Sequence, residues 1–508
     1  MLVSNILLVE PDYRAKFPPL GLMRLSTYHK ERGDYITFVR GREPEKQAMH
    51  WHRIYISSLF TWELPRTVKT IRYYAPSVNS PEDDIYVGGI GATLQPEFIR
   101  EQAECRIIEG QIEKPGVLGG GSPPIAGLVP DYAILDSVDY KYEPNDAYFA
   151  KITKGCVRRC EFCAVPKLEP EFGVLSPLEE QVAAIEQTHG TRQHLVIMDN
   201  NVLAVEGIEK ALETIESLGF QRGAKRGKRY RTVDFNQGID ARFIAKRPEL
   251  ATALGRLALK PIRLAFDFLS PAIERDYRKA IKLLAEQGFV EFTTYLLYNY
   301  HDTPEDFYRR LQINMELSRK LGIRVSGFPM RYIPATDTKR GHVSKNWKWR
   351  WLRGIQCVLQ ATHGLVSPNP DFIAAAFGED REDFYRILSM PDRYITYREH
   401  YKNNGADEWW NEYRKLSEPE QNEFLDLLER LNKDRRRKET IAGMKKFRSL
   451  VEHYYPNGNT SPGTPGEEHA TIRTKNLADI VPYSNKYSRC MQTNVKMEFL
   501  FALQLNLG

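Results

Sequence analysis

The feature that most constrains the fold is an alternation of short apolar strands with amphipathic helices, which the chain repeats in two blocks. In the first block a helix follows the segment 18–22 and ends near Gly33, and a second helix covers 64–74. Strands are expected around these helices at 5–9, 35–39, 54–59 and 85–87. This order predicts a parallel, doubly wound sheet. Gly88-Gly89 follows the last strand, where such sheets place ligand-facing turns, although a plain tight turn has the same sequence.

The second block has longer periods and begins near residue 148. Its strands are expected at 149–153, 194–198, 232–235, 262–266, 292–298 and 323–328. Helices are expected between them near 177–189, 206–218, 247–258, 272–287 and 304–321. Six strands with five intervening helices predict a partial parallel barrel of the (β/α)6 type. Active sites of βα barrels lie at the carboxyl ends of the strands, so the segment after each strand is a candidate site.

Three cysteines, Cys156, Cys160 and Cys163, follow the first strand of the second block with the spacing C-x3-C-x2-C. One loop thereby offers three thiolates. A four-iron, four-sulfur (4Fe-4S) cube bound by three ligands keeps one iron open for a small molecule with two donor atoms. Zinc with a distant fourth ligand is the alternative. A zinc knuckle would not be expected at the mouth of a barrel, so the position favours the iron–sulfur interpretation.

The cysteine motif and its place after the first barrel strand resemble the radical S-adenosylmethionine (SAM) superfamily. The resemblance implies a 4Fe-4S cluster at Cys156, Cys160 and Cys163, SAM bound at the open iron, and reductive cleavage of SAM to a 5′-deoxyadenosyl radical. In such enzymes the cofactors supply the difficult chemistry, and the protein positions and shields them. A reductant such as flavodoxin or ferredoxin is then an expected partner.

The N-terminal block resembles the cobalamin-binding-type domain that precedes the barrel in one radical SAM class. The resemblance rests on Pro18-Pro19-Leu20-Gly21-Leu22 and on the stretch from Gly88 to Glu97. The motif D-x-H-x-x-G is missing from the sequence, so no histidine is marked as a cobalt ligand. His29, His50 and His52 are expected at the surface. Cobalamin as a further cofactor therefore stays an open question at this stage.

Polar residues at other strand ends are candidates for SAM binding. The resemblance implies that Asp199 or Asn200 holds the SAM amino group, although either could instead cap a helix. Gln237 or Arg242 could reach the methionyl carboxylate, because arginine offers a planar pair of donors; a surface ion pair of Arg242 with Asp240 is the alternative.

Asp267 is the next SAM-binding candidate, for the ribose or the amino group. It lies between two aromatic residues, and an isolated carboxylate is costly to bury there without a partner.

Substrate contacts are expected from Asn299, His301 and Arg331 at the last two strand ends, and no catalytic residue is assigned. His301 could equally be structural, and Arg331 could form a surface ion pair. Thr303, Glu305 and Asp306 are interpreted as a helix N-cap with an acidic first turn.

Length and composition describe an ordinary globular protein. The chain has 508 residues, of which 42% are hydrophobic and 27% charged, and its formal net charge is +6. We expect no membrane-spanning segment, because no apolar run approaches about 20 residues. Six cysteines in this length do not suggest a disulfide framework, and Cys105, Cys357 and Cys490 are expected to be buried or half-buried free thiols. A reducing cytoplasm fits this composition.

The predicted fold class is α/β followed by helices. Its expected divisions are a cobalamin-binding-like sheet domain, a radical SAM partial barrel, a helical C-terminal domain, and a linker with a tail, at 1–130, 131–340, 341–455 and 456–508. Glycine-rich sequence at 116–124 is expected to connect the first two.

Three basic segments, 222–231, 345–353 and 433–448, keep nucleic acid as a second expected partner class, because phosphate backbones attract cations and aromatic residues stack on bases. Solvated loops and packed helices with extended cations are the alternative. The leading hypothesis is a radical SAM enzyme with an unidentified substrate, and methylation of that substrate is one candidate outcome. The other hypotheses are a nucleic-acid-binding protein with a cysteine-bound structural metal, and a radical SAM enzyme that modifies RNA or DNA.

Overall fold

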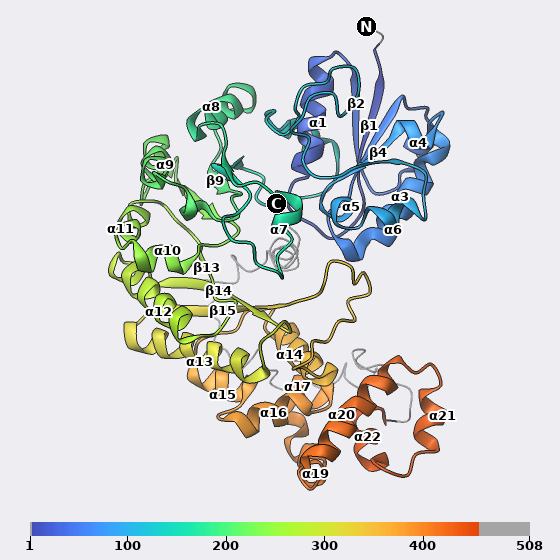
Figure 1. Ribbon diagram of the computed structural model, residues 1–508, viewed down its shortest axis with the longest axis vertical. Helices are drawn as coiled ribbons and strands as arrows, with labels where there is room; N and C mark the ends of the chain where they lie inside the picture. Colours follow the sequence, from blue (N-terminus) through green and yellow to red (C-terminus); the bar gives the residue numbers. More distant parts are fainter. Residues whose placement is uncertain (1–2, 457–508) are drawn as a thin grey trace.

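The computed structural model describes residues 3–456 and contains two parallel-sheet units followed by a helical region (Figure 1). The first unit is a five-stranded sheet in the order β2-β1-β3-β4-β5, with every neighbouring pair parallel. Its strands are β1 Asn5–Glu10, β2 Tyr35–Arg40, β3 Arg53–Ser57, β4 Ile85–Gly88 and β5 Arg106–Ile108. The order reverses between β1 and β3, which is the switch point of a doubly wound sheet.

Helices cover both faces of this sheet, as the alternation of strands and helices predicted. On β1, Ile6 and Leu8 pack into the core that contains α1, whereas Leu7 and Val9 pack on the opposite side with α3. The two helices are α1 Leu20–Glu31 and α3 Leu64–Tyr74, and shorter helical segments are α2 Pro44–Gln47, η1 Thr61–Glu63, η2 Ala75–Ser77, α4 Pro81–Asp84, α5 Ile90–Leu94 and α6 Pro96–Arg100. Strand residues buried on both faces are typical of parallel sheets.

One histidine of this unit departs from the sequence-based expectation. His50 and His52 are exposed as predicted, but His29 is buried. Its Nδ1 shares a hydrogen bond with Asp34 (2.7 Å) and its Nε2 shares one with the Tyr55 hydroxyl (3.0 Å). The prediction was wrong because His29 lies on the face of α1 that packs against the sheet, where these two partners satisfy its ring nitrogens.

The second unit has six strands in sequence order, as predicted for a partial barrel. Two parallel groups, β6-β9-β12 and β13-β14-β15, are joined by parallel bridges of Val233 with Leu259 and of Ile239 with Leu264. The strands are β6 Ala147–Ala150, β9 His194–Ile197, β12 Thr232–Phe235, β13 Ile262–Ala265, β14 Glu291–Tyr298 and β15 Arg324–Arg331. The main helices between them are α8 Leu178–His189, α9 Ile208–Ile215, α10 Ala241–Lys246, α11 Glu249–Gly255, α12 Pro271–Glu286 and α13 Pro304–Leu321.

Two elements of the barrel differ from the prediction in detail. The helix expected at 247–258 is α11, which begins at Glu249, and it is preceded by a short helix, α10, that was not predicted. The two are separate because Pro248 disfavours the helical conformation of the residue before it. The first strand ends at Ala150 rather than 153. Residues Thr153–Lys154 instead form β7, which pairs antiparallel with β8 Gly173–Val174 on the far side of the cysteine loop.

The edge of the incomplete barrel is closed by a segment from the helical region. Val366 forms two main-chain hydrogen bonds with Gly327 of β15, of 2.8 and 2.9 Å, in an antiparallel bridge. The neighbouring Leu365 packs against Tyr295, Phe328 and Met330. The barrel interior is therefore completed by residues from beyond its last strand.

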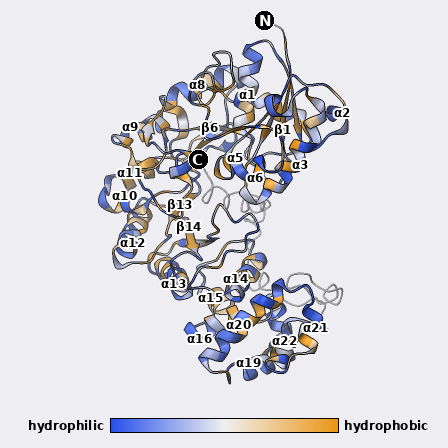
Figure 2. Cartoon of the chain, turned by 45° about the vertical axis from the view of Figure 1, so that its right-hand side comes forward, coloured by the Kyte–Doolittle hydropathy of each residue, from blue (hydrophilic) through white to orange (hydrophobic). Residues whose placement is uncertain are grey.

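The rest of the described chain is helical, as predicted for this region. Its helices are α14 Trp349–Ala361, α15 Pro370–Phe377, α16 Arg381–Ser389, α17 Asp392–Thr396, α18 Arg398–Tyr401, α19 Asp407–Tyr413, α20 Glu418–Lys433, α21 Arg437–Ala442 and α22 Arg448–Tyr454. Hydrophilic stretches mark the outer helices, and apolar residues concentrate on the central strands (Figure 2). No helix within residues 3–456 is long and apolar enough to cross a bilayer. Cys490 and most of the expected linker and tail lie outside the described residues.

Candidate functional site

The three clustered cysteines lie on the loop between β7 and α7 Val165–Leu168. All three are half-buried free thiols. The Cys163 N–H donates to the Cys160 carbonyl (3.0 Å), and the Arg158 N–H donates to Cys156 Sγ (3.3 Å). Burial raises the pKa of Cys160 and raises that of Cys163 to about 12, and the neighbouring thiols raise both further. The three sulfurs are thus close enough to influence one another's charge, although within residues 3–456 no three His, Cys, Asp or Glu side chains stand in a metal-binding arrangement.

A buried carboxylate, Glu169, holds the start of this loop. Its Oε2 accepts the Gly155 N–H (2.7 Å) and the Asn200 amide (2.9 Å). Its Oε1 accepts from the Lys151 ammonium and from the Gln111 amide. Glu169 therefore connects the cysteine loop to the end of β6, to the end of β9 and to the segment after β5. Carboxylates that accept several hydrogen bonds are strong anchors because each bond is charge-assisted.

Gly155 itself needs the conformation that only glycine adopts easily. Its φ is +68°, and a Cβ at this position would lie 2.3 Å from the Glu171 carbonyl oxygen. The backbone before Cys156 is thereby pressed against the segment that follows α7.

The carboxylate of Asp199, predicted to bind the SAM amino group, accepts hydrogen bonds from the segment between β6 and the cysteine loop. It accepts the Ile152 N–H (2.9 Å), the Thr153 N–H (2.6 Å) and the Thr153 hydroxyl (2.6 Å). Burial raises its pKa to about 6 against the effect of these hydrogen bonds. Asp199 and Glu169 together fix the chain on both sides of β7. In this arrangement Asp199 and Asn200 position the loop.

Two buried acceptors near the cysteine loop have no hydrogen-bond partner. Asn201 donates its amide to Cys156 Sγ (3.7 Å), while its Oδ1 is unpartnered. Asp267 acts electrostatically on Cys160 and Cys163, and its Oδ1 is also unpartnered. Burial raises the pKa of Asp267 to about 6, although Arg310 and Arg242 lower it. Buried acceptors without partners are costly, so this pair offers a place for a ligand that carries N–H or O–H donors.

The candidates after the third strand are held by a local ion pair. Arg242 binds Asp240 through Nε (2.7 Å) and Nη2 (2.9 Å). Asp240 also accepts from Arg158 of the cysteine loop (3.2 Å), and the two arginines hold the pKa of Asp240 below its usual range against its burial. Gln237 is half-buried on the same strand end. The ion pair between Arg158 and Asp240 therefore ties the cysteine loop to the segment that follows β12.

The structure brings two of the three predicted substrate-binding residues, Asn299 and Arg331, to one carbonyl oxygen, that of His342. Asn299 is fully buried with φ +68°, donates to the Tyr332 and His342 carbonyls, and accepts the Ser344 N–H. Arg331 donates to the same His342 carbonyl (2.6 Å). Both side chains hold the loop that follows β15, whereas His301 is exposed.

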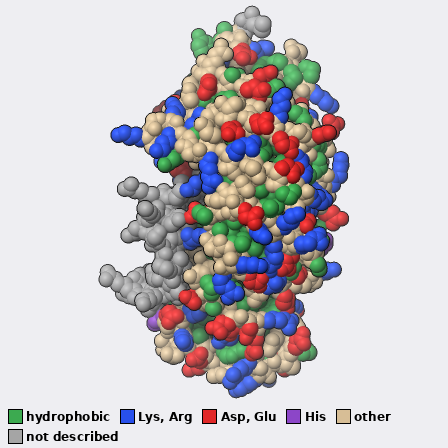
Figure 3. All heavy atoms as spheres, turned by 90° about the vertical axis from the view of Figure 1, so that its left-hand side faces the viewer, with side chains coloured by type: hydrophobic (Ala, Val, Ile, Leu, Met, Phe, Trp, Pro, Cys, Tyr) green, Lys and Arg blue, Asp and Glu red, His purple; other side chains and the backbone are tan. Residues whose placement is uncertain are grey.

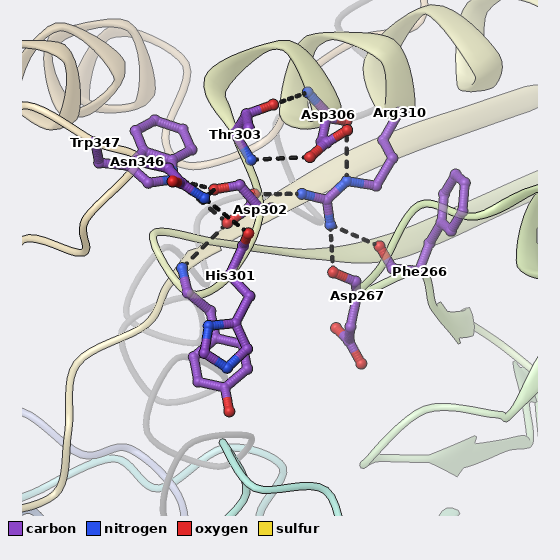
Figure 4. A network of polar contacts seen from close by, with 10 residues as sticks. Phe266, Asp267, His301, Asp302, Thr303, Asp306, Arg310, Asn346 and Trp347 are labelled. Atoms are coloured by element: carbon purple, nitrogen blue, oxygen red, sulfur yellow. Dashed lines mark hydrogen bonds and ion pairs between the residues drawn. The ribbon is translucent and has the colours of Figure 1, made fainter.

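Arg310 of α13, which the sequence did not mark, positions the backbone of Asp267 (Figure 4). It is fully buried, and it donates to the Phe266 carbonyl (3.0 Å) and the Asp267 carbonyl (2.6 Å). Its Nη2 forms an ion pair with Asp302 (2.8 Å). The Asp267 carboxyl points away from this guanidinium (Figure 4). At the same helix, Thr303 and Asp306 form the predicted capping box.

Aromatic rings from four elements gather beside the cysteine loop. Phe162, between Cys160 and Cys163, lies 5.3 Å from Phe268 and 5.7 Å from Tyr300, measured between ring centroids. Tyr332 lies 4.8 Å from Tyr300 in an edge-on arrangement. This cluster provides an apolar wall at the carboxyl ends of β13, β14 and β15.

The carboxyl edge of the N-terminal sheet offers little for cobalamin. No histidine lies on it among the described residues, since His52 precedes β3 and His29 is buried in α1. A Cβ on Gly89 would lie 2.7 Å from the Ser58 carbonyl oxygen, and one on Gly91 would lie 2.6 Å from Ser58 Oγ. The glycines thus allow the loops after β3 and β4 to pack on each other. Among the described residues, this edge therefore offers no histidine as a cobalt ligand.

Several cationic side chains of the predicted basic segments form ion pairs within the protein. Arg350 and Arg353 both bind Asp392, and Lys348 binds Asp426. By contrast, the hairpin of β10 Lys225–Arg226 and β11 Arg229–Tyr230 is exposed. On the face drawn in Figure 3, lysine and arginine are interspersed with acidic residues.

No protein-family model and no curated protein matches the chain. Solved structures do match. The radical SAM methyltransferase TsrM from Kitasatospora setae, with cobalamin and a 4Fe-4S cluster bound, aligns with a TM-score of 0.46 at 13% identity over 66% of this chain and 77% of that chain. The cobalamin-dependent SAM radical enzyme OxsB with aqua-cobalamin bound aligns with a TM-score of 0.44 at 11% identity, over 100% and 85%.

Proposed function

We propose that this chain is a radical SAM enzyme whose Cys156, Cys160 and Cys163 hold a 4Fe-4S cluster. The observation that carries the proposal is the joint placement of three thiols and two unpartnered buried acceptors, Asn201 and Asp267, at the carboxyl ends of the two three-stranded parallel sheets of the barrel. Thiolates are the ligands that iron–sulfur clusters require, and the acceptors suit the amino and hydroxyl groups of SAM. The donor set therefore fits both cofactors.

In the proposed reaction, some residues of the chain would bind SAM and others would exclude water. With the cluster and SAM bound, the cofactors supply a one-electron cleavage that generates a carbon radical. Asn201 Oδ1 and Asp267 Oδ1 would accept hydrogen bonds from SAM and orient it toward the thiols. Phe162, Phe268 and Tyr300 would line the adjacent wall and exclude water. Excluding water protects a reactive intermediate from side reactions.

The proposal implies an electron donor and a reducing compartment such as the cytoplasm. A flavodoxin or ferredoxin would deliver the electron at the half-exposed cysteine loop. The reaction that follows radical formation and the identity of its substrate are not assigned; methyl transfer is one candidate outcome.

The primary experiment compares anaerobically reconstituted wild-type protein with Cys160→Ala and with Cys105→Ala, an isolated half-buried thiol. With dithionite and SAM, wild type and Cys105→Ala should produce 5′-deoxyadenosine, and Cys160→Ala should not. Zinc without iron in oxygen-free wild-type protein would contradict the proposal and favour a structural metal site.

A second experiment separates SAM binding from cluster binding. Asn201→Ala and Asp267→Asn should retain iron but bind SAM about ten- to a hundredfold more weakly in equilibrium dialysis, because a hydrogen bond to a charged group contributes about 1.5–3 kcal/mol. Asn422→Ala, an exposed amide on α20, is the matched control. Equal affinity in all four proteins would remove Asn201 and Asp267 from the SAM site.

A nucleic acid is the second candidate, as the substrate of the same enzyme. The observation that favours it is the exposed hairpin, where Lys225 lies over the ring of Tyr230 (4.5 Å) and Tyr230 is 61% exposed. Exposed aromatics beside cations bind single-stranded nucleic acid by stacking. Fluorescence anisotropy with single-stranded RNA should show binding that weakens with salt and falls in Tyr230→Ala, and salt-independent or absent binding would exclude it.

A further inference from the structure

The helical region beyond the barrel contains two arginines whose buried donors have too few acceptors. Arg386 lies on α16, and Arg398 begins α18. Three of their N–H groups are shielded from solvent and have no hydrogen-bond partner, namely Nε and Nη2 of Arg398 and Nε of Arg386. Each of these N–H groups has lost water without gaining an acceptor, which is costly for a charged group.

The nearby carboxylates do not balance the two charges. Asp383 binds Nη2 of Arg386 at 2.6 Å, and Glu399 and Asp383 attract Arg398 only from a distance. Burial and the neighbouring Arg386 lower the pKa of Arg398 to about 10. The two guanidinium groups are therefore close enough to repel each other, and Asp383 forms the one ion pair of 4.0 Å or less recorded for them within residues 3–456. A buried charge of this kind strongly favours an added anion.

We propose that Arg386 and Arg398 form a binding site for a phosphate group, either free phosphate or a phosphomonoester on a small molecule. Nε and Nη2 of Arg398 form one edge of the guanidinium fork, which binds two oxygens of an oxyanion side by side. Nε of Arg386 supplies a third donor. A phosphomonoester has three terminal oxygens and two negative charges, so it matches three donors and two cations, whereas a carboxylate leaves one donor unused.

An aromatic side chain borders the site. Trp410 of α19 is half-buried, and its ring centroid lies 5.7 Å from Cζ of Arg386. An indole face beside a phosphate site favours a ligand that also carries a flat ring, such as a nucleoside monophosphate. The helices that form the site lie at the end of the molecule opposite the N-terminal sheet (Figure 1). The inference is thus independent of the cysteine loop and of the proposed reaction.

The test is thermal unfolding of the full chain with increasing inorganic phosphate at constant ionic strength. A ligand that binds only the folded state raises the Tm in a concentration-dependent way, and we expect this for wild type. Arg398→Met should bind phosphate at least tenfold more weakly, and its Tm without phosphate should equal or exceed that of wild type because an uncompensated buried charge is removed. Arg275→Met, at a side chain that is 72% exposed, is the control and should respond like wild type. No phosphate response in wild type, or an equal response in Arg398→Met, overturns the proposal.

If Arg398→Met does not fold, equilibrium dialysis of wild-type protein with radioactive phosphate tests the proposal directly. Retention of the label by the protein supports the site, and no retention overturns it. Competition then identifies the source of the group. Adenosine monophosphate displacing the label at least tenfold better than free phosphate indicates a nucleotide, and equal displacement indicates phosphate itself. Displacement only by single-stranded RNA without terminal phosphates would overturn the phosphomonoester assignment.

Discussion

The carboxylate of Glu169 accepts the main-chain N–H of Gly155 at 2.7 Å, one residue before the first of the three clustered cysteines. The same carboxylate binds Lys151, Asn200 and Gln111, so one acid fixes the loop from three directions. A flexible loop would lose conformational entropy when it wraps a cluster. Fixing the loop beforehand reduces this loss, which is the advantage of preorganised ligands.

The substitution Glu169→Gln should weaken both the fold and the cluster site. It leaves the half-buried Lys151 without its partner, and breaking a buried ion pair costs about 3–5 kcal/mol. We expect a loss of this size in urea unfolding and less iron per chain after reconstitution. Glu171→Gln, at an exposed neighbour, is the control. Unchanged iron content in Glu169→Gln would show that the carboxylate does not support the cluster.

Replacing Gly155 by alanine should distort the loop even more directly. The new Cβ would meet the Glu171 carbonyl oxygen at 2.3 Å, and φ of +68° is unfavourable for alanine. Strained backbone of this kind costs about 1–3 kcal/mol before the steric clash is added. Iron content and unfolding free energy should both fall. Gly127→Ala meets no atom within 4 Å and should change neither.

Removal of the Arg310 guanidinium should destabilise the barrel. Arg310→Met leaves Asp302 buried without its charge partner, and we expect a loss of about 3–5 kcal/mol in urea unfolding. The double variant Arg310→Met, Asp302→Asn should recover part of this loss, because the uncompensated carboxylate is then neutral. Arg275→Met should have nearly no effect, since exposed ion pairs contribute little. Additive single effects in the double variant would contradict a direct pair.

Glu10, at the end of β1, should make stability depend on pH. Burial raises its pKa from 4.5 to about 8, although hydrogen bonds from Tyr142 and the charge of Arg40 act in the opposite direction. The folded protein therefore holds a proton that the unfolded chain has released. The contribution of Glu10 to the free energy of unfolding is complete below pH 4.5 and is lost as the pH rises through 8.

Urea unfolding between pH 5 and pH 9 tests this expectation. Wild type should lose stability steadily over the range, and Glu10→Gln should lack this part of the slope because its side chain is permanently neutral. At pH 9 the variant should be the more stable protein. Parallel curves for the two proteins would show that Glu10 is ionised in the folded state.

Local patterns in the sequence were sufficient for much of the fold. The helix Pro304–Leu321 was predicted with its bounds because Thr303 and Asp306 form a capping box, and the strand Thr232–Phe235 was predicted because apolar residues stand between turn signals. The end of the first barrel strand was missed because it depends on the pairing of Thr153 with Val174, which no local pattern encodes.

At the candidate site too, local sequence patterns identified some residues, whereas contacts between distant segments determined the roles of others. The spacing of the three cysteines marked the loop directly. Asn299, in contrast, looked like a substrate contact because it is polar and ends a strand, but its amide is used by the backbone around Tyr332 and Ser344. Glu169 was missed because its partners are distant in sequence. Arg310 was missed because the carbonyls of Phe266 and Asp267 that it binds belong to another strand end, although its ion-pair partner Asp302 is near in sequence. An isolated acid or base next to apolar residues is the one signal that could have drawn attention to them.

The bridge between Val366 and Gly327 limits where the chain can be truncated. Strand β15 would otherwise present a bare row of N–H and C=O groups, which is a template for pairing with another molecule. A fragment that stops after Arg331 would expose this row together with the apolar side chains behind it. Such a fragment should self-associate, so the barrel is not a separable module without the segment that carries Val366.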